Sequence, residues 1–205
     1  ISHKGTIVDA TFVDAPRQRN SRDENKKIKN GVIPEEWEKP ENKSKLAQKD
    51  IDADWTKKNG ERHFGYKDHV KCDADSKLIT NYSVTSASVH DSQRCLVFIG
   101  QEDEVLYADS AYSGKPIALA LPENCKNQIC EKGYRNSPLT SEQKMNNRRK
   151  SRIRCRIEHI FGFMTGAMHG ITIRSIGITR AWMNIGITNL VYNFCRYSYL
   201  KRASA

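Results

Sequence analysis

The chain has 205 residues, with 34 Lys and Arg against 24 Asp and Glu, so its formal net charge at pH 7 is +10. This length is enough for one domain with a sizeable core, and no apolar run approaches the roughly 18 residues that a membrane-spanning helix requires. The excess of positive charge favours a polyanionic partner, most often a nucleic acid. The six cysteines have no complete zinc-ligand spacing and are interpreted as free thiols in a reducing compartment. The chain begins with a polar Ile-Ser-His segment and has neither an initial Met nor a signal peptide, so we interpret it as a fragment of a longer protein.

The first part of the chain predicts a strand, a polar insertion and a hairpin. Residues 5–13 are rich in β-branched and aromatic side chains, which is typical of a strand. Residues 16–62 are polar and contain two Asn-Gly dipeptides, so we expect a long, mobile loop or insertion there. Residues 64–72 and 77–85 predict the two arms of a β-hairpin.

The second part alternates between helices and short strands. Residues 91–100 and 114–121 predict short helices, and residues 104–109 and 128–130 predict short strands. A longer helix is expected to begin at Ser141 and to reach Met164, because apolar residues recur on one helical face at positions 153, 157, 160, 161 and 164. Residues 176–200 predict a closing helix with Trp182 and Tyr197 in the core. This order indicates one mixed α/β domain over residues 1–205.

Three acidic residues lie in or beside segments that are expected to be buried, where a charge costs free energy. Asp9 is inside an apolar strand, Asp109 ends another, and Glu158 lies in the amphipathic helix beside its apolar face. A buried carboxylate needs a partner or a metal ion. If the three side chains converge, Mg²⁺ or Mn²⁺ would relieve their repulsion, because these ions prefer oxygen ligands.

Each of the three also has a structural interpretation. Asp9 could cap a turn or pair with a lysine, and Asp109 could cap a following helix. Glu158 could pair with Arg154, one helical turn earlier. These alternatives stay open at this stage.

A basic run leads directly to Glu158. It holds seven cations and no acidic residue. A phosphate backbone would neutralise this positive charge, although most such runs form a basic surface in contact with solvent. Arg154 lies one turn before Glu158 on the same side, which suits an enzyme that must hold a phosphodiester against a bound metal ion. The seven cations are Lys144, Arg148, Arg149, Lys150, Arg152, Arg154 and Arg156.

Several ordered blocks of the sequence resemble those of bacterial insertion-sequence DDE transposases. The resemblance rests on Asp9 in Ile-Val-Asp-Ala-Thr, Asp109 in Tyr-Ala-Asp-Ser-Ala-Tyr and Glu158 in Arg-Cys-Arg-Ile-Glu-His-Ile-Phe. Residues 64–70 and 88–92 also resemble the intervening blocks of the group that includes insertion sequences four and five. The glutamate block keeps the Arg-x3-Glu core, but Ser151 and Thr165 replace the Tyr and Lys that often flank it in that group.

The resemblance implies a ribonuclease H-like α/β fold, a mixed sheet flanked by helices with the polar insertion after its first strand. It implies that Asp9, Asp109 and Glu158 are the catalytic carboxylates and that they hold two Mg²⁺ or Mn²⁺ ions, with Asp9 as the bridging ligand. The implied activity is cleavage of double-stranded DNA at the element's ends and strand transfer to target DNA. The chain would act in the bacterial cytoplasm at the nucleoid, as a homodimer, with the family's N-terminal DNA-binding region outside this sequence.

Further DNA contacts are expected around the site. Arg154 is assigned to the phosphate of the scissile strand. Weaker contacts to the DNA backbone are expected from Lys150, Arg152 and Arg156, and the resemblance places Lys67 and His90 at the rim of the site. Two other functions are kept open: a ribonuclease H-like nuclease without strand transfer, and an inactive, DNA-binding transposase remnant.

Overall fold

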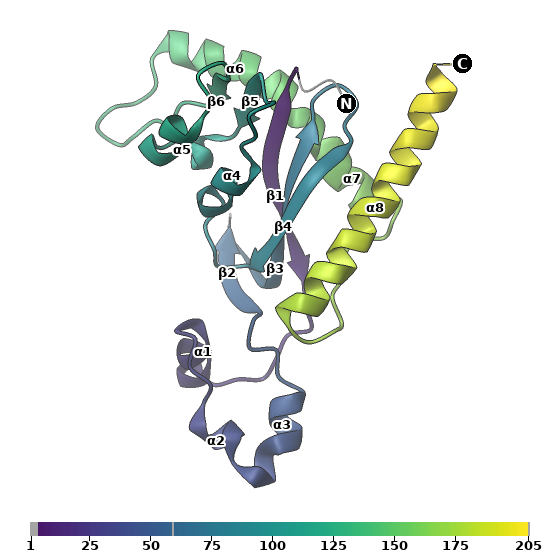
Figure 1. Cartoon of the computed structure of the whole chain (residues 1–205). Helices are drawn as coiled ribbons and strands as arrows, with labels where there is room; N and C mark the ends of the chain where they lie inside the picture. The colour runs from purple at the N-terminus through teal and green to yellow at the C-terminus, as the bar shows by residue number, and fades with distance from the viewer. Residues whose placement is uncertain (1–3, 59, 205) are drawn as a thin grey trace.

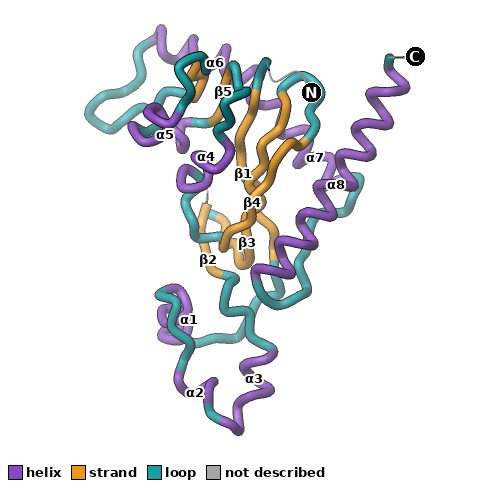
Figure 2. Tube along the Cα trace, in the orientation of Figure 1, coloured by secondary structure: helices purple, strands orange, loops and turns teal. Residues whose placement is uncertain are grey.

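The computed structural model describes residues 4–58 and 60–204. Over these residues the chain forms a mixed sheet of six strands with helices on both faces (Figures 1 and 2). The strand order is β2-β3-β1-β5-β6, and β4 pairs with β3 off this path. β1 runs antiparallel to β3 and parallel to β5, and β6 is parallel to β5. The predicted fold class is confirmed, and the arrangement is consistent with a ribonuclease H-like fold.

Most elements lie where the sequence predicts them. The strands are β1 (Thr6–Asp14), β2 (Asp54–Lys58), β3 (Glu61–Asp73), β4 (Ile79–Ser86), β5 (Val105–Ala108) and β6 (Lys126–Ile129). The helices that follow the hairpin are α4 (Ser92–Phe98), α5 (Lys115–Ala120), α6 (Ser141–Arg154), α7 (Glu158–Gly166) and α8 (Ile178–Ala203), with short 3-10 helices η2 (Ser110–Tyr112) and η3 (Cys155–Ile157).

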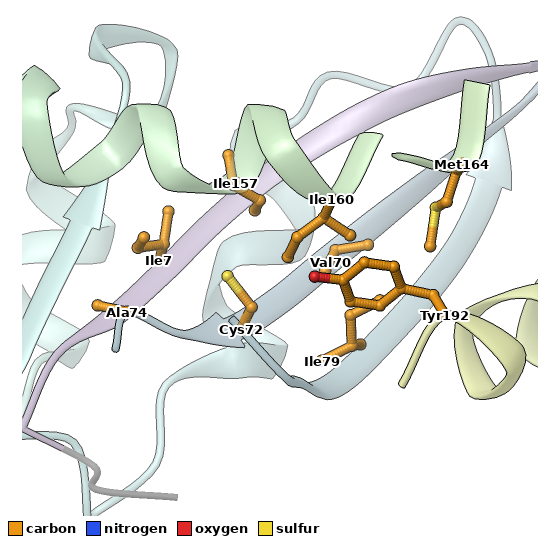
Figure 3. Packing of buried hydrophobic residues seen from close by; sticks show 9 residues of the cluster. All are labelled: Ile7, Val70, Cys72, Ala74, Ile79, Ile157, Ile160, Met164 and Tyr192. Carbon is orange, nitrogen blue, oxygen red and sulfur yellow. The ribbon is translucent and has the colours of Figure 1, made fainter. Parts of the chain in front are cut away.

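Both faces of the sheet are buried, and β1 contributes to both. Successive side chains of a strand point to opposite faces. Ile7 therefore packs with the apolar residues of α7 and α8, whereas Val8 packs with those of α4 and α5. Figure 3 shows the first of these clusters, in which Ile157 and Ile160 of the long helical segment lie over Ile7.

The helix predicted from Ser141 to Met164 is confirmed with one irregularity. The chain is α-helical in α6 and α7, but η3 between them has 3-10 geometry. Its predicted apolar face is buried at positions 157, 160 and 164. Glu158 is consequently the first residue of α7, directly after the irregular turn.

Of the two alternatives predicted for residues 16–62, the long loop is wrong, and an insertion after the first strand stays a prediction. This segment contains α1 (Arg22–Lys29), α2 (Glu35–Glu38), η1 (Pro40–Asn42) and α3 (Lys43–Ala47), and its last part forms β2 and the start of β3. We call residues 21–47 the helical arm, which extends from one end of the sheet (Figure 1). Whether the arm is mobile stays a prediction.

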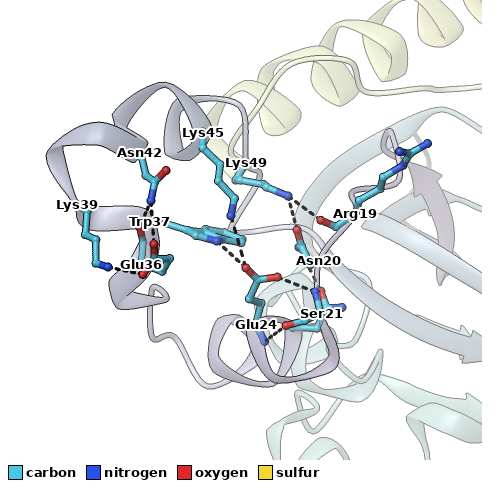
Figure 4. A network of polar contacts seen from close by, with 11 residues as sticks. Arg19, Asn20, Ser21, Glu24, Glu36, Trp37, Lys39, Asn42, Lys45 and Lys49 are labelled. Carbon is cyan, nitrogen blue, oxygen red and sulfur yellow. Dashed lines mark hydrogen bonds and ion pairs between the residues drawn. The ribbon is translucent and has the colours of Figure 1, made fainter.

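A single tryptophan organises the helical arm. Trp37 is fully buried, and its indole Nε1 donates a hydrogen bond to Glu24 Oε1 at 2.8 Å. The ammonium groups of Lys45 and Lys49 lie over the indole ring, 5.7 and 5.0 Å from its centroid (Figure 4). Ser21 and Glu24 form a capping box at the start of α1. Helix caps and cation–π contacts order this polar segment. Neither kind of contact produces a periodic pattern of hydrophobic residues in the sequence.

The closing helix is confirmed, but its orientation differs from the prediction. Trp182 and Tyr197, expected in the core, are 42% and 56% exposed. The side packed on the sheet carries Ala181, Ile185 and Tyr192 instead. α8 is apolar on nearly all sides, so hydrophobic periodicity does not indicate which side faces the sheet. We call the exposed side the outer face of α8; it carries Met183, Ile187, Leu190, Phe194 and Tyr197.

Among the described residues, no helix has both the length and the apolar character that crossing a bilayer requires.

Candidate active site

Two of the predicted carboxylates come from neighbouring parallel strands. In the register of β1 and β5, Ile7 pairs with Tyr107. Asp9 and Asp109 each lie two residues further along, so both share the face of Ile7, the one that α7 covers. Strand pairing therefore places Asp9 and Asp109 side by side, although 100 positions of sequence separate them.

The third carboxylate is brought to this point by the helices. Glu158 begins α7, and Arg154 ends α6 one turn earlier. Arg154 Nη1 donates a hydrogen bond to Asp9 Oδ2 at 2.8 Å and lies 3.4 Å from Glu158 Oε1. The guanidinium group thus connects the helix to the central strand.

Asp9, Asp109, Glu158 and Arg154 line one hollow of about 430 Å³, which we call the carboxylate hollow. The structure therefore brings together the three predicted carboxylates and one of the predicted DNA-binding cations. The remaining walls come from β1, from the β2–β3 hairpin and from α7: Ala10, Thr11, Phe12, Lys58, Glu61, His63 and Phe161.

The pKa of Asp9 is strongly shifted by its surroundings. Burial raises the pKa of Asp9 to about 6, and the negative charges of Asp109 and Glu158 add to this rise. The Ala10 amide, which donates to Asp9 Oδ1 at 2.8 Å, and the Arg154 guanidinium lower the pKa of Asp9. A carboxyl pKa shifted in this way is typical of functional sites, although structural ion pairs also shift pKa values.

The structural interpretations of Asp109 and Glu158 also hold, whereas the one given for Asp9 is wrong. Asp109 Oδ1 accepts a hydrogen bond from the Ala111 amide at 2.7 Å and so caps η2. Glu158 pairs with Arg154, and Asp9 pairs with the same arginine rather than with a lysine. The three acids therefore make these local contacts and also line the same hollow.

The donor set of the hollow fits a hard divalent cation in its chemistry. All three acids offer carboxylate oxygens, which Mg²⁺ and Mn²⁺ prefer. Within the described residues, however, no three acidic, histidine or cysteine side chains are grouped closely enough to hold one ion. The positive charge beside Asp9 is supplied by Arg154. The guanidinium therefore competes with a metal ion for Asp9 Oδ2, whereas Asp9 Oδ1 accepts only the Ala10 amide among the hydrogen bonds of the described residues.

The two predicted rim residues lie outside the hollow. Lys67 Nζ donates to the Val89 carbonyl at 2.6 Å and pairs with Asp91 at 2.8 Å. His90 is exposed, and its Nδ1 lies 2.8 Å from Ser92 Oγ. Lys67 would have to leave its partners to contact DNA, whereas His90 is accessible.

The cations of α6 and η3 differ in how freely they face solvent. Lys150 donates to the Ile129 carbonyl at 2.9 Å, and Arg156 donates to the Ala74 carbonyl at 2.9 Å. Arg152 is exposed. Of the predicted DNA contacts, Arg154 alone lines the carboxylate hollow among the described residues.

Sequence reasoning missed one wall of the hollow, the end of the β2–β3 hairpin. It contributes Lys58, Glu61 and His63. The His63 ring stacks on Phe12 with centroids 4.1 Å apart and planes at 5°. The signal for this wall is the Asn-Gly dipeptide at positions 59–60, because Asn-Gly between two strands is typical of a hairpin turn.

The chain matches the family described as "Transposase DDE domain" over residues 2–194. The chain therefore belongs to the DDE transposase family. No solved structure matches the chain. The family match supports DNA as the partner of this transposase domain, and it spans every residue that lines the carboxylate hollow.

Proposed function

We propose that this transposase domain cleaves DNA and transfers strands during transposition of an insertion sequence of the group that includes insertion sequences four and five. Asp9, Asp109 and Glu158 would be its catalytic carboxylates. The observation that carries the proposal is that three separate segments of the chain bring these side chains to one hollow. Their order along the chain is also the Asp-Asp-Glu order of the family's name.

Each side chain would contribute differently. Two Mg²⁺ or Mn²⁺ ions held by the three carboxylates would supply activation of the attacking hydroxyl and stabilisation of the leaving oxygen. Asp9 lies on a central strand, so its carboxylate would hold an ion from a fixed position. The Glu158 side chain is 56% exposed and begins a helix, so it can adjust to its ligand. Arg154, once it releases Asp9, would donate to an oxygen of the scissile phosphate.

One site can serve both reactions. Attack of water on phosphorus forms a P–O bond, breaks the bond to the 3′-oxygen and leaves a 3′-hydroxyl at the element's end. That hydroxyl can then attack a target phosphate, which forms one P–O bond and breaks another. Both are in-line displacements at phosphorus, so the same carboxylates and arginine can position them.

The charge of the chain supports a duplex as substrate. The formal net charge is +10, and the basic run that contains Lys150, Arg152 and Arg156 leads into the hollow. Neutralisation of phosphates by such cations dominates non-specific DNA affinity. We propose that the chain acts in this way on element ends and target DNA at the bacterial nucleoid.

The outer face of α8 supports a second copy as a further partner. Its apolar residues recur at intervals of four and three over positions 183–197, which is the spacing of a helix–helix seam. With half of each side chain exposed, they leave an apolar patch on the order of 600 Å², near the upper end for a monomer. Sedimentation of the wild type and of Leu190→Glu tests this, because a charge in the seam should lower the association constant. Equal, monomeric sedimentation of both would exclude it.

The metal site is tested by calorimetry with Mn²⁺ in the presence of a short duplex. We expect binding by the wild type and none by the double variant Asp9→Ala, Asp109→Ala. A matched control, Asp23→Ala with Glu41→Ala, removes two acidic charges from the helical arm and should bind Mn²⁺ like the wild type. A wild type that binds duplex but no Mn²⁺ would favour the inactive remnant.

The chemistry is tested with Glu158→Gln, which keeps the shape of the side chain and removes its charge. A transposase or nuclease should lose cleavage and keep its affinity for duplex DNA. An inactive remnant has no cleavage to lose. Joined product with a labelled 3′-hydroxyl end separates strand transfer from simple hydrolysis: cut but never joined DNA would support the nuclease.

A further inference from the structure

A second pocket lies between α7, α8 and the turn that joins β3 to β4. Its volume is about 220 Å³. We call it the Lys77 pocket. Three of its lining side chains are basic, three are aromatic, and none of those described is acidic: Lys77, His159, Arg196, Phe163, Tyr192, Tyr199 and, in addition, Cys195.

This pocket and the carboxylate hollow share the helix α7. Glu158 and Phe161 line the hollow, whereas His159 and Phe163 line the Lys77 pocket. Consecutive helical residues point about 100° apart, so neighbouring positions serve different surfaces. Ile160, between the two surfaces, is buried against the sheet (Figure 3). A ligand that extends across the exposed side of α7 can therefore reach both sites.

The turn that carries Lys77 is held in place by α8. Tyr192 Oη donates a hydrogen bond to the Lys77 carbonyl at 2.9 Å, and Arg196 Nε donates to the Ser76 carbonyl at 2.7 Å. The Asn193 side chain binds both the amide and the carbonyl of Ile79, each at 2.8 Å. Lys77 itself has a φ of 59°, an uncommon conformation for a residue other than glycine. These contacts fix the turn, so Lys77 projects from a rigid position.

The basic groups of the pocket lie close together. Lys77 Nζ is 3.3 Å from His159 Nδ1, and the Arg196 guanidinium lies over the Tyr199 ring, 5.0 Å from its centroid. Burial, and then the positive charges of Arg196 and Arg156, lower the pKa of the Lys77 ammonium. The positive charges of Lys77 and Arg196, held together in this way, attract an anion because its negative charge removes their repulsion.

We propose that the Lys77 pocket binds a phosphate group of the DNA backbone, with Lys77, His159 and Arg196 as donors to its oxygens. This assignment of the phosphate to DNA rests on the proposed function, since the same duplex would occupy the carboxylate hollow across α7. The pocket acts in positioning: it takes no part in the chemistry and fixes the duplex at a second point.

The test compares Lys77→Asn with the wild type. Asparagine tolerates the left-handed conformation of this position, so the substitution removes the charge and keeps the turn. Lys39→Asn is the matched control, because it removes one positive charge from the helical arm, where Lys39 pairs with Glu36. Equal thermal unfolding of the three proteins shows that they are folded.

The first measurement is the affinity for a labelled duplex over a series of salt concentrations. Loss of one phosphate contact should reduce the slope of log K against log salt by about 0.9 and weaken binding at low salt by about tenfold. We expect this for Lys77→Asn and not for Lys39→Asn. An unchanged slope in Lys77→Asn overturns the assignment to DNA.

The second measurement uses the unmodified chain and is independent of DNA. Cys195 is exposed and lines the pocket. Inorganic pyrophosphate, or the duplex, should slow alkylation of Cys195 by iodoacetamide. Protection by pyrophosphate in a chain that binds no duplex would keep the phosphate site and reject its DNA source, together with the proposed function. Cleavage of DNA without protection of Cys195 by either probe would reject the site and leave the proposed function intact.

Discussion

Asp68 provides a sharp test of the energetics of this fold. It is fully buried on β3, where it interacts with the Asn189 side chain of α8. Neither oxygen of the Asp68 carboxylate has a full hydrogen bond from the described residues. Burial raises the pKa of Asp68 to about 7, against a smaller opposing effect of the Asn189 amide. Between these two pKa values, 3.8 in the unfolded chain and about 7 in the folded chain, the folded chain holds a proton on Asp68 that the unfolded chain has released.

The sign of the effect follows from the two pKa values of this carboxyl. In the unfolded chain Asp68 titrates near 3.8 and in the folded chain near 7, so the wild type loses stability as pH rises between these values. At about 1.4 kcal/mol for each tenfold change in proton affinity, the full loss is about 4 kcal/mol. Water entry at high pH would reduce this figure.

The substitution Asp68→Asn removes the titrating group and keeps its shape. Urea unfolding should give similar free energies of unfolding for the two proteins at pH 3.5. The variant should be more stable by about 2 kcal/mol at pH 5 and by up to about 4 kcal/mol at pH 8. Asp23→Asn, on the exposed surface of α1, is the control and should show no such trend. A difference that stays constant with pH would refute the reasoning.

Three further predictions concern single contacts. Lys67→Met should lower the free energy of unfolding by about 3 kcal/mol in urea, because it leaves the largely buried carboxylate of Asp91 unpaired. A smaller loss in Asp91→Asn, Lys67→Met than in the single variant would confirm this cause. Gly65→Ala should cost about 3 kcal/mol or more in the same assay, since φ is +145° there and an added Cβ would lie 2.3 Å from the Val13 carbonyl oxygen. A loss below 1 kcal/mol would show that the strand shifts freely. Trp37→Ala should speed amide exchange in the helical arm and leave β1 unchanged, because Trp37 holds only the arm together. Faster exchange in β1 as well would show that the arm supports the sheet.

The sequence predicted those elements whose signals are local. For the β-branched run of β1 and the apolar face at positions 157, 160 and 164, a short stretch of sequence is enough to predict which side chains are buried. The helical arm shows the limit of such signals. Its order depends on contacts between Trp37 and residues from other segments, such as Glu24, which no periodicity records.

The outer face of α8 shows a second limit. Burial of an apolar side chain is favourable, but a helix that is apolar on most sides has several orientations that bury a similar apolar surface area. Packing against β4 and β3 selects the side with Ala181 and Ile185 and leaves Trp182 exposed. The sequence alone could not choose between these orientations.

The candidate site combines both kinds of information. By itself the sequence indicated Asp9 and Asp109 as candidates, because a carboxylate inside or at the end of an apolar strand is costly wherever that strand lies. It indicated Glu158 through its place beside the apolar face of a helix and through the family resemblance. The tertiary structure alone decided that Arg154 reaches Asp9 across 145 positions, that His63 lines the same hollow and that Lys67 is held by Asp91. The physical reason is that strand register and helix orientation are set by the packing of the whole core, and these distant pairs meet only after that packing is complete.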